Sequence, residues 1–287
     1  MIIANPIYDV VFKRMMEDDR VAKFFIGTLL NEAVEEVKVK PQEFTYTDRL
    51  AGLAVYRVDF VATIKTDPGN YKKVLIEIQK AKNVIDLMRF RNYLAEQYKK
   101  EDEIETVEGK KKTALPIVTI YLLGFTLPEI ETSAVSVKRD YVDLNTNKVI
   151  GKRSDFIEQL THDCFVVQLP RIQTKYQTRL DKLLSIFEQA NFVDDKKIIK
   201  QFNHEVDEQG VKTITDILHY IGTDPGEKKQ IEDEQEAWRT VDAMFEEKTE
   251  KLRRELLINK KELEEKEKAL EEKDKLIEEL KRKLSEK

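Results

Sequence analysis

Two strand-like segments joined by a turn constrain this chain more than any other feature. Residues 53–64, LAVYRVDFVATI, are rich in β-branched and aromatic residues, and residues 73–79 contain a short apolar run. Between them lies TDPGN (66–70), in which proline followed by glycine is typical of a tight turn. The sequence therefore predicts an antiparallel hairpin.

Carboxylates interrupt both predicted strands. Asp59 lies in the first strand, whereas Glu77 and Gln79 lie two residues apart in the second and so share one face. Burying a carboxylate is unfavourable unless it is paired, hydrogen-bonded or bound to a metal. Because the turn can bring Asp59 and Glu77 together, and Mg²⁺ prefers a few carboxylate oxygens, a divalent-cation site would account for both residues.

Ion pairs or an exposed strand face would also account for these carboxylates. Arg57, Lys80 and Arg89 are close in the sequence and could pair with them at the edge of a sheet. The polar residues could equally mark a face that is open to solvent. Apolar residues at both odd and even positions of 53–64 argue against full exposure, but spacing alone does not decide between a metal site and ion pairs.

Helical and strand-like segments alternate around the hairpin. We expect helices within 5–30 and at 83–100, a charged connector at 101–113, and strands at 115–125, 136–144 and 163–170, with helices after Pro170. This order predicts a mixed α/β fold, a sheet flanked by helices, rather than an all-helical bundle. We divide the chain into a core at 1–170, a helical extension at 171–240 and a charged helical tail at 241–287.

The segment 251–287 has the pattern of a long exposed helix. It contains no Gly or Pro, and leucine or isoleucine recurs every seven residues from Leu256 to Leu284. The adjacent seam, which includes Asn259, Lys266 and Lys273, is apolar only at its ends. A coiled coil and a solitary helix stabilised by i,i+4 ion pairs both fit this pattern. We expect self-association through 251–287 into a homo-oligomer.

Composition limits the classes of function. The single cysteine, Cys164, excludes an internal disulfide and a thiolate metal cluster, and no apolar run is long enough to span a bilayer. We therefore expect a soluble cytoplasmic protein with no membrane partner. The net charge of −5 is accounted for by the acidic segment 226–250, so the remainder is neutral and bulk charge gives no support for nucleic-acid binding.

Several segments in order resemble the PD-(D/E)XK nuclease superfamily, and more narrowly its Rpn-type branch of recombination-promoting, transposase-like nucleases. VDF (58–60) and IEIQ (76–79) resemble the metal-site core of that family, and RFRNY (89–93) resembles an R-x-x-x-Y pattern in the following helix. Weaker similarities lie in YDVVFKRMM, LPIVTIYLLGF, RDYVDL and FVVQLPR. The resemblance covers about residues 5–190.

The resemblance implies a restriction-endonuclease-like fold and an endonuclease that hydrolyses DNA with a water activated by Mg²⁺ or Mn²⁺, linked to recombination or mobile elements. It implies that Asp59 and Glu77 bind the metal. Gln79 stands where the wider superfamily has a lysine, and because glutamine carries no charge, we expect Lys13 or Arg89 to supply the missing cation.

Two further residues follow from the same resemblance. Asp9 would hold Lys13 or lie near the metal, unless it only caps its helix. Tyr93 would share a helix face with Arg89, four residues earlier. The alternative function is that of a catalytically weak or inactive nuclease-fold protein that oligomerises through its tail.

Overall fold

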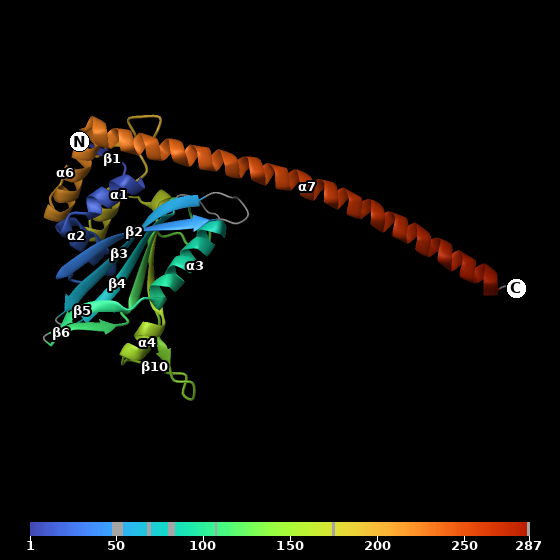
Figure 1. The fold of residues 1–287 in the computed structure, drawn as a ribbon, viewed down its shortest axis with the longest axis horizontal. Coiled ribbons are helices and arrows are strands. Elements are labelled where there is room, and N and C mark those ends of the chain that lie inside the picture. Colours follow the sequence, from blue (N-terminus) through green and yellow to red (C-terminus); the bar gives the residue numbers. More distant parts are fainter. Residues whose placement is uncertain (48–53, 68–69, 80–83, 107, 174–175, 286–287) are drawn as a thin grey trace. The chain divides into compact units, whose positions relative to one another are not determined.

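The computed structural model describes residues 1–47, 54–67, 70–79, 84–106, 108–173 and 176–285, in two compact units, 1–234 and 235–287 (Figure 1). The helices are α1 (Asp9–Met16), α2 (Asp19–Leu30), α3 (Val84–Lys99), α4 (Asp155–Leu160), α5 (Arg179–Ser185), α6 (Gln209–Thr223) and α7 (Pro225–Ser285). The strands are β1 (Ile2–Ala4), β2 (Glu36–Thr47), β3 (Ala54–Asp67), β4 (Asn70–Gln79), β5 (Asp102–Thr106), β6 (Gly109–Thr113), β7 (Ile117–Leu123), β8 (Ala134–Val137), β9 (Tyr141–Val142), β10 (Val149–Ile150), β11 (His162–Gln168) and β12 (Ile199–Gln201).

A six-stranded mixed sheet organises the first unit, in the order β2-β3-β4-β7-β11-β8. The pairs β2–β3 and β3–β4 are antiparallel, β4–β7 and β7–β11 are parallel, and β11–β8 is antiparallel. The parallel pair β4–β7 needs a crossover connection, and α3 lies within it. The mixed α/β fold, the hairpin and the helix that follows it are thus confirmed.

Helices cover both faces of the sheet. On one face, Phe60, Ile76 and Ile120 belong to a large apolar core shared with α1, α2, α5 and α6. On the other face, Val61 and Leu75 pack with Tyr93 of α3. Because alternate residues of a strand point to opposite faces, residues 60–65 of β3 and 71–79 of β4 can each be assigned to one of these two layers.

The start of α1 is capped from a distant part of the chain. The residue before it, Tyr8, makes no side-chain cap. Instead, the backbone N–H groups of Asp9 and Val10 donate to the two carboxylate oxygens of Glu234, each at 3.0 Å. This satisfies two of the N–H groups that an α-helix leaves without an intrahelical acceptor, and it fixes the first turns of α7 to the N-terminal segment.

Several elements differ from the sequence-based expectation. The long strand β2 was not predicted, and the expected connector 101–113 contains the hairpin β5–β6. The expected strand 136–144 is divided into β8 and β9, because Arg139 between them turns to bind Glu158 at 2.9 Å and Asp163 at 3.1 Å. The last part of the expected strand 163–170 is a 3₁₀ turn, Leu169–Arg171.

In α7, the leucines that recur every seven residues have exposed side chains. Leu256, Leu263, Leu270 and Ile277 are all exposed in the second unit. The helix itself is therefore as expected, whereas pairing of 251–287 into a coiled coil stays a prediction. Within the part of the chain that is described, no helix combines the length and apolar character needed to cross a bilayer.

Lys200 of β12 is a buried cation that closes the end of α5. Its Nζ donates to the backbone carbonyl of Glu188 at 2.6 Å and to that of Ser185 at 3.4 Å. Burial lowers the pKa of Lys200 to about 8, because the charged amine loses hydration that nearby Glu188 only partly replaces.

The stability of the fold should therefore rise with pH in the alkaline range. In the unfolded chain Lys200 recovers its usual pKa of 10.5, so between pH 8 and 10.5 the unfolded state binds more protons than the folded state. Burial of the charged amine lowers the free energy of unfolding by an amount on the order of 3 kcal/mol. This loss is complete below pH 8, and deprotonation of Lys200 removes it as the pH rises. We expect the melting temperature of Lys200→Met to rise less between pH 7.5 and 10 than that of the wild type.

Circular dichroism melts across this pH range measure the effect. The exposed Lys148→Met serves as the control that removes one lysine without removing a buried one. Equal pH slopes for the wild type and Lys200→Met would contradict the assignment.

Candidate functional site

The β3–β4 ladder ends one residue before each of the two predicted metal ligands. The last pairs between β3 and β4 are Val61 with Leu75 and Phe60 with Ile76. Asp59 and Glu77 are the next residues on the two strands. Both residues therefore lie just beyond the end of the β3–β4 ladder, where Asp59 pairs with Gln42 of β2 and Glu77 pairs with Tyr121 of β7. The structure describes the backbone of Asp59 but not its side chain.

Glu77 and Gln79 lie on the face of the sheet that α3 covers. They share the parity of Leu75, which packs with Tyr93 of α3, whereas Ile76 packs toward α1 and α2. Glu77 is 3% exposed and Gln79 is 8% exposed. An acidic side chain and an amide side chain, two residues apart in the sequence, are therefore buried in the layer between the sheet and α3.

Tyr121 forms one side of this layer. It lies on β7 directly beside Glu77 in the parallel register, and its ring contacts Phe90 of α3 in an edge-to-face arrangement with centroids 4.5 Å apart. Burial raises the pKa of Tyr121 well above its usual value. The phenol therefore stays protonated at neutral pH and can act as a hydrogen-bond donor next to Glu77. Sequence reasoning missed Tyr121 because strand pairing, not sequence proximity, brings it to the site.

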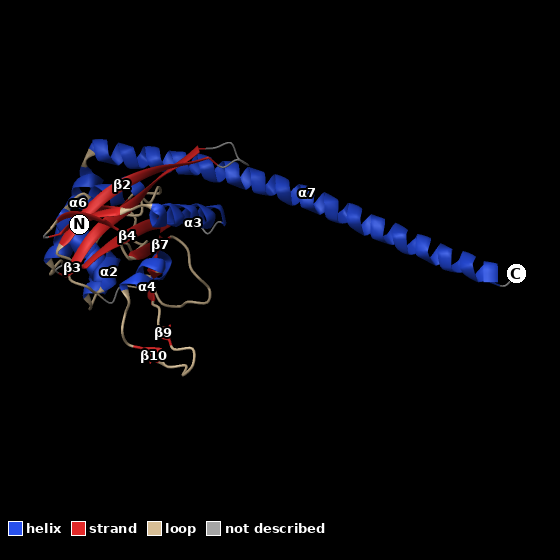
Figure 2. Cartoon of the chain, turned by 60° about the horizontal axis from the view of Figure 1, so that its bottom comes forward, coloured by secondary structure: helices blue, strands red, loops and turns tan. Residues whose placement is uncertain are grey.

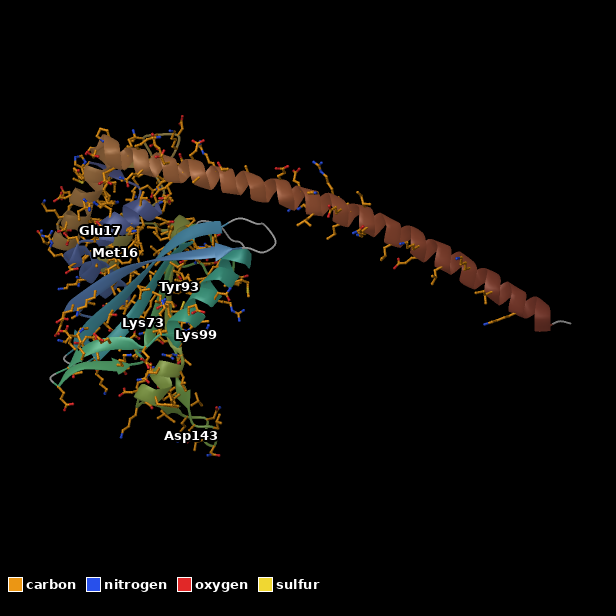
Figure 3. The ribbon with its side chains drawn as sticks, in the orientation of Figure 1. Met16, Glu17, Lys73, Tyr93, Lys99 and Asp143 are labelled. Atoms are coloured by element: carbon orange, nitrogen blue, oxygen red, sulfur yellow. The ribbon has the colours of Figure 1, made fainter. Side chains whose placement is uncertain are left out.

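The helix α3 contributes the residues of the R-x-x-x-Y pattern. Tyr93 is buried between the helix and the sheet (Figure 3). Arg89 is one helical turn nearer the start of α3 and so falls on the same helix face as Tyr93. The side chain of Arg89 lies outside the described residues, as do Lys80 and Lys82. The backbone thus brings Arg89 to the face of the sheet that carries Glu77.

Lys73 is a buried cation on the same face of the sheet as Glu77, and it is already paired. It is 3% exposed, its Nζ lies 2.8 Å from a carboxylate oxygen of Asp102, and it donates to the carbonyl of Gln97 at 3.3 Å. Four residues of strand separate Lys73 from Glu77, about 13 Å at the usual rise. Lys73 therefore holds β4, α3 and β5 together and lies too far away to replace the missing lysine.

The structure places Lys13 on the other face of the sheet. Its side chain lines a cavity of about 410 Å³ together with Val37, Val39 and Phe60. Phe60 points into the core formed with α1 and α2, away from the layer that holds Glu77. Of the two cations predicted to compensate for Gln79, only Arg89 lies on an element that covers the site.

Asp9 is also not brought to Glu77 by the contacts of its helix. It begins α1, where its backbone N–H is bound by Glu234. Its neighbours along the helix, Val11 and Phe12, are buried in the core on the opposite face from α3. The structure therefore places the backbone of Asp9 at a helix start on that opposite face.

No group of three His, Cys, Asp or Glu side chains gathers around a common point in the described part of the chain. The side chain of Asp59 lies outside that part. Comparison of the chain with models of protein families, with curated proteins and with solved structures finds no match.

Proposed function

We propose that the chain is a Mg²⁺- or Mn²⁺-dependent endonuclease that hydrolyses phosphodiester bonds of DNA. The observation that carries the proposal is the burial of Glu77 on the α3 side of the sheet, one residue beyond the last β3–β4 pair, with Asp59 one residue beyond the same pair on β3. Acidic residues on two neighbouring strands, with an E-x-Q sequence on the second, are what the resemblance to the Rpn-type nucleases implies. A link to recombination or mobile elements follows from that resemblance alone.

The donors at this site suit a hard divalent cation. Carboxylate oxygens are the ligands that Mg²⁺ prefers, and a site with few protein ligands leaves positions for water and phosphate. Asp59 and Glu77 would hold the ion. When bound, it would polarise the scissile phosphate and lower the pKa of a coordinated water. The buried position of Glu77 supports this fit, because a buried carboxylate must be paired, hydrogen-bonded or bound to a metal.

The remaining residues have roles that follow from their positions and charges. Gln79 is uncharged and can orient the attacking water through its amide. Tyr121 is protonated at neutral pH and can donate a hydrogen bond to an oxygen near Glu77. Arg89 would supply positive charge to the transferring phosphate, since a guanidinium binds phosphate oxygens through two N–H groups at once. Tyr93, one turn further along α3, anchors this part of the helix to the sheet.

Relaxation of supercoiled plasmid tests two points: whether the chain cleaves DNA, and whether Arg89 supplies the positive charge that Gln79 lacks. The wild-type chain should nick plasmid in Mg²⁺ and lose that activity in EDTA. Arg89→Met should lower the nicking rate by about 10- to 100-fold, because loss of one charged contact to the transition state costs roughly 1.4–2.7 kcal/mol.

Lys13→Met is the matched control, since it removes one cation from the opposite face of the sheet. It should nick plasmid at the wild-type rate. A greater loss in Lys13→Met than in Arg89→Met would contradict the assignment of faces, and equal activity with EDTA and with Mg²⁺ would contradict metal-dependent hydrolysis.

A second candidate function is that of a catalytically weak or inactive nuclease-fold protein that works through its tail. The exposed leucines of α7 favour it, because such a row on a helix is a surface for another helix. Self-association through 251–287 is compatible with both candidates. Calorimetric titration with Mn²⁺ separates them: heat of binding that Glu77→Gln removes supports the nuclease, and no heat for the wild type supports the second candidate.

A further inference from the structure

The far edge of the six-stranded sheet ends in a short strand with an open side. β8 pairs with β11 and is the last strand in the described sheet. Val137 at its end is 56% exposed, and Ser136 is also exposed. An open edge with apolar side chains and no charge within the strand is a template for pairing with another strand.

The ladder shows which backbone groups of β8 face outward. The N–H of Gln168 donates to the carbonyl of Ser133 at 2.7 Å, so these residues form a hydrogen-bonded position of the antiparallel ladder. Such positions alternate along the strand. Val135 and Val137, two and four residues further on, therefore bond to β11, and Ala134 and Ser136 direct their N–H and C=O groups outward.

Exposed apolar side chains continue beyond the strand. β9, β10 and α4 follow β8 in the chain and lie toward the lower end of the first unit in both views (Figures 1 and 2), where the hydroxyl of Tyr141 in β9 donates to Glu158 of α4. None of the residues of α4 is buried. The exposed apolar residues of this stretch include Val137, Val142, Leu144, Val149, Phe156 and Leu160. Exposed apolar side chains that adjoin an open strand edge favour association with another surface.

The charges that flank β8 indicate what covers it. Glu129 and Glu131 precede the strand and are exposed, and Lys138 follows it and is also exposed. If two copies of β8 pair in antiparallel orientation, the acidic end of each lies against the basic end of the other. Parallel pairing would place like charges together. Antiparallel pairing of identical strands also has the two-fold symmetry of most homodimers.

We propose that β8 pairs with β8 of a second copy of this chain, so that the two six-stranded sheets join across a two-fold axis. The outward N–H and C=O groups of Ala134 and Ser136 form the hydrogen bonds between the copies. Val137, Phe156 and Leu160 supply apolar contact area beside the strands. This interface belongs to the first unit and is separate from the predicted association of the tail and from any catalytic activity.

Sedimentation equilibrium of the full chain tests the interface in a background without tail pairing. Leu263→Glu combined with Leu270→Glu places charges in the exposed leucine row and removes the contribution of α7. This background variant should sediment as a dimer at tens of micromolar protein. Adding Ser136→Pro should give a monomer, because proline removes an outward N–H but leaves the bonds from Val135 and Val137 to β11 intact.

A second pair of variants avoids the risk that proline disturbs folding. Val137→Glu should also give a monomer, because it brings a carboxylate toward the acidic end of the other copy. Val193→Glu is the matched control, because Val193 is 54% exposed and lies outside β8, and it should remain dimeric. A monomeric background variant, or a Val137→Glu variant that remains dimeric, overturns the proposal.

Discussion

Replacing Glu77 with glutamine is expected to abolish DNA cleavage. Loss of a metal ligand removes several kcal/mol of transition-state stabilisation, which corresponds to at least about a 100-fold decrease in the nicking rate. Melts in EDTA report separately on the folded state, because each kcal/mol of stability shifts the melting temperature by about 2–4 °C in a unit of this size.

The two measurements together separate a metal ligand from a structural ion pair. Plasmid nicking in Mg²⁺ and thermal melts in EDTA are compared for the wild type, Glu77→Gln and Glu108→Gln. Glu108 is exposed in the turn between β5 and β6, so its substitution removes one negative charge far from the site. A lower melting temperature with unchanged nicking in Glu77→Gln would mean that Glu77 is the anion of a stabilising pair.

Replacing Lys73 with methionine is expected to cost about 3–5 kcal/mol of folding free energy. The substitution leaves Asp102 as a poorly hydrated carboxylate without the ammonium that lies 2.8 Å from it. In the first unit this corresponds to a fall in melting temperature of about 10 °C. Denaturant unfolding followed by circular dichroism measures the loss.

The double variant Lys73→Met/Asp102→Asn should recover a large part of that stability. Asparagine removes the stranded charge but retains an oxygen that can accept the N–H of Leu115, which Asp102 binds at 3.3 Å. The exposed pair Lys112–Glu101 provides the contrast, since Lys112→Met should change stability by less than about 1 kcal/mol. If Lys73→Met lowers the free energy of unfolding no more than Lys112→Met does, the Lys73–Asp102 pair does not hold β4 to β5.

The sequence predicted those elements whose residues carry a clear local pattern. The hairpin β3–β4 has dense β-branched segments on both sides of a Pro-Gly turn, and α3 and α7 have long apolar or charged periodicities. The placement of Asp59 and Glu77 at the same end of the β3–β4 ladder followed from the same turn, because the position of a tight turn sets the register of a hairpin. These features depend on neighbouring residues and so could be recognised without a structure.

Elements stabilised by distant or ionic contacts were not predicted. β2 contains Pro41, which argues against a central strand but is tolerated at a sheet edge, where this strand lies. β5 and β6 bury little apolar surface, and ion pairs such as Glu103–Lys110 at 2.6 Å link them across the hairpin. A charged segment of this kind has the composition of a connector, so periodicity cannot reveal its pairing.

The shared face of Glu77 and Gln79 was predicted, whereas the positions of the residues around them were not. Glu77 and Gln79 could be placed on one face by strand parity alone. The separation of Lys13 from that face depends on the way in which α1 packs through Phe12 and Met15, and a helix-start motif contains no such information. Tyr121 and the Lys73–Asp102 pair likewise depend on the parallel pairing of β7 and on the path of β5.

The pairing of β1 with β12 sets an order for assembly during synthesis. Residues 2–4 form their only ladder in the described structure with residues 199–201, and α1 is capped by Glu234. At roughly 5–20 residues per second, a ribosome takes about 10–40 s to reach these partners after the first strand has emerged. During that interval the buried side chains of Ile3 and Ala4 lack the strand beside which they fold. Nascent chains that end before residue 199 should therefore bind chaperones through residues 2–4. Release from the chaperones should coincide with emergence of α6 and the start of α7.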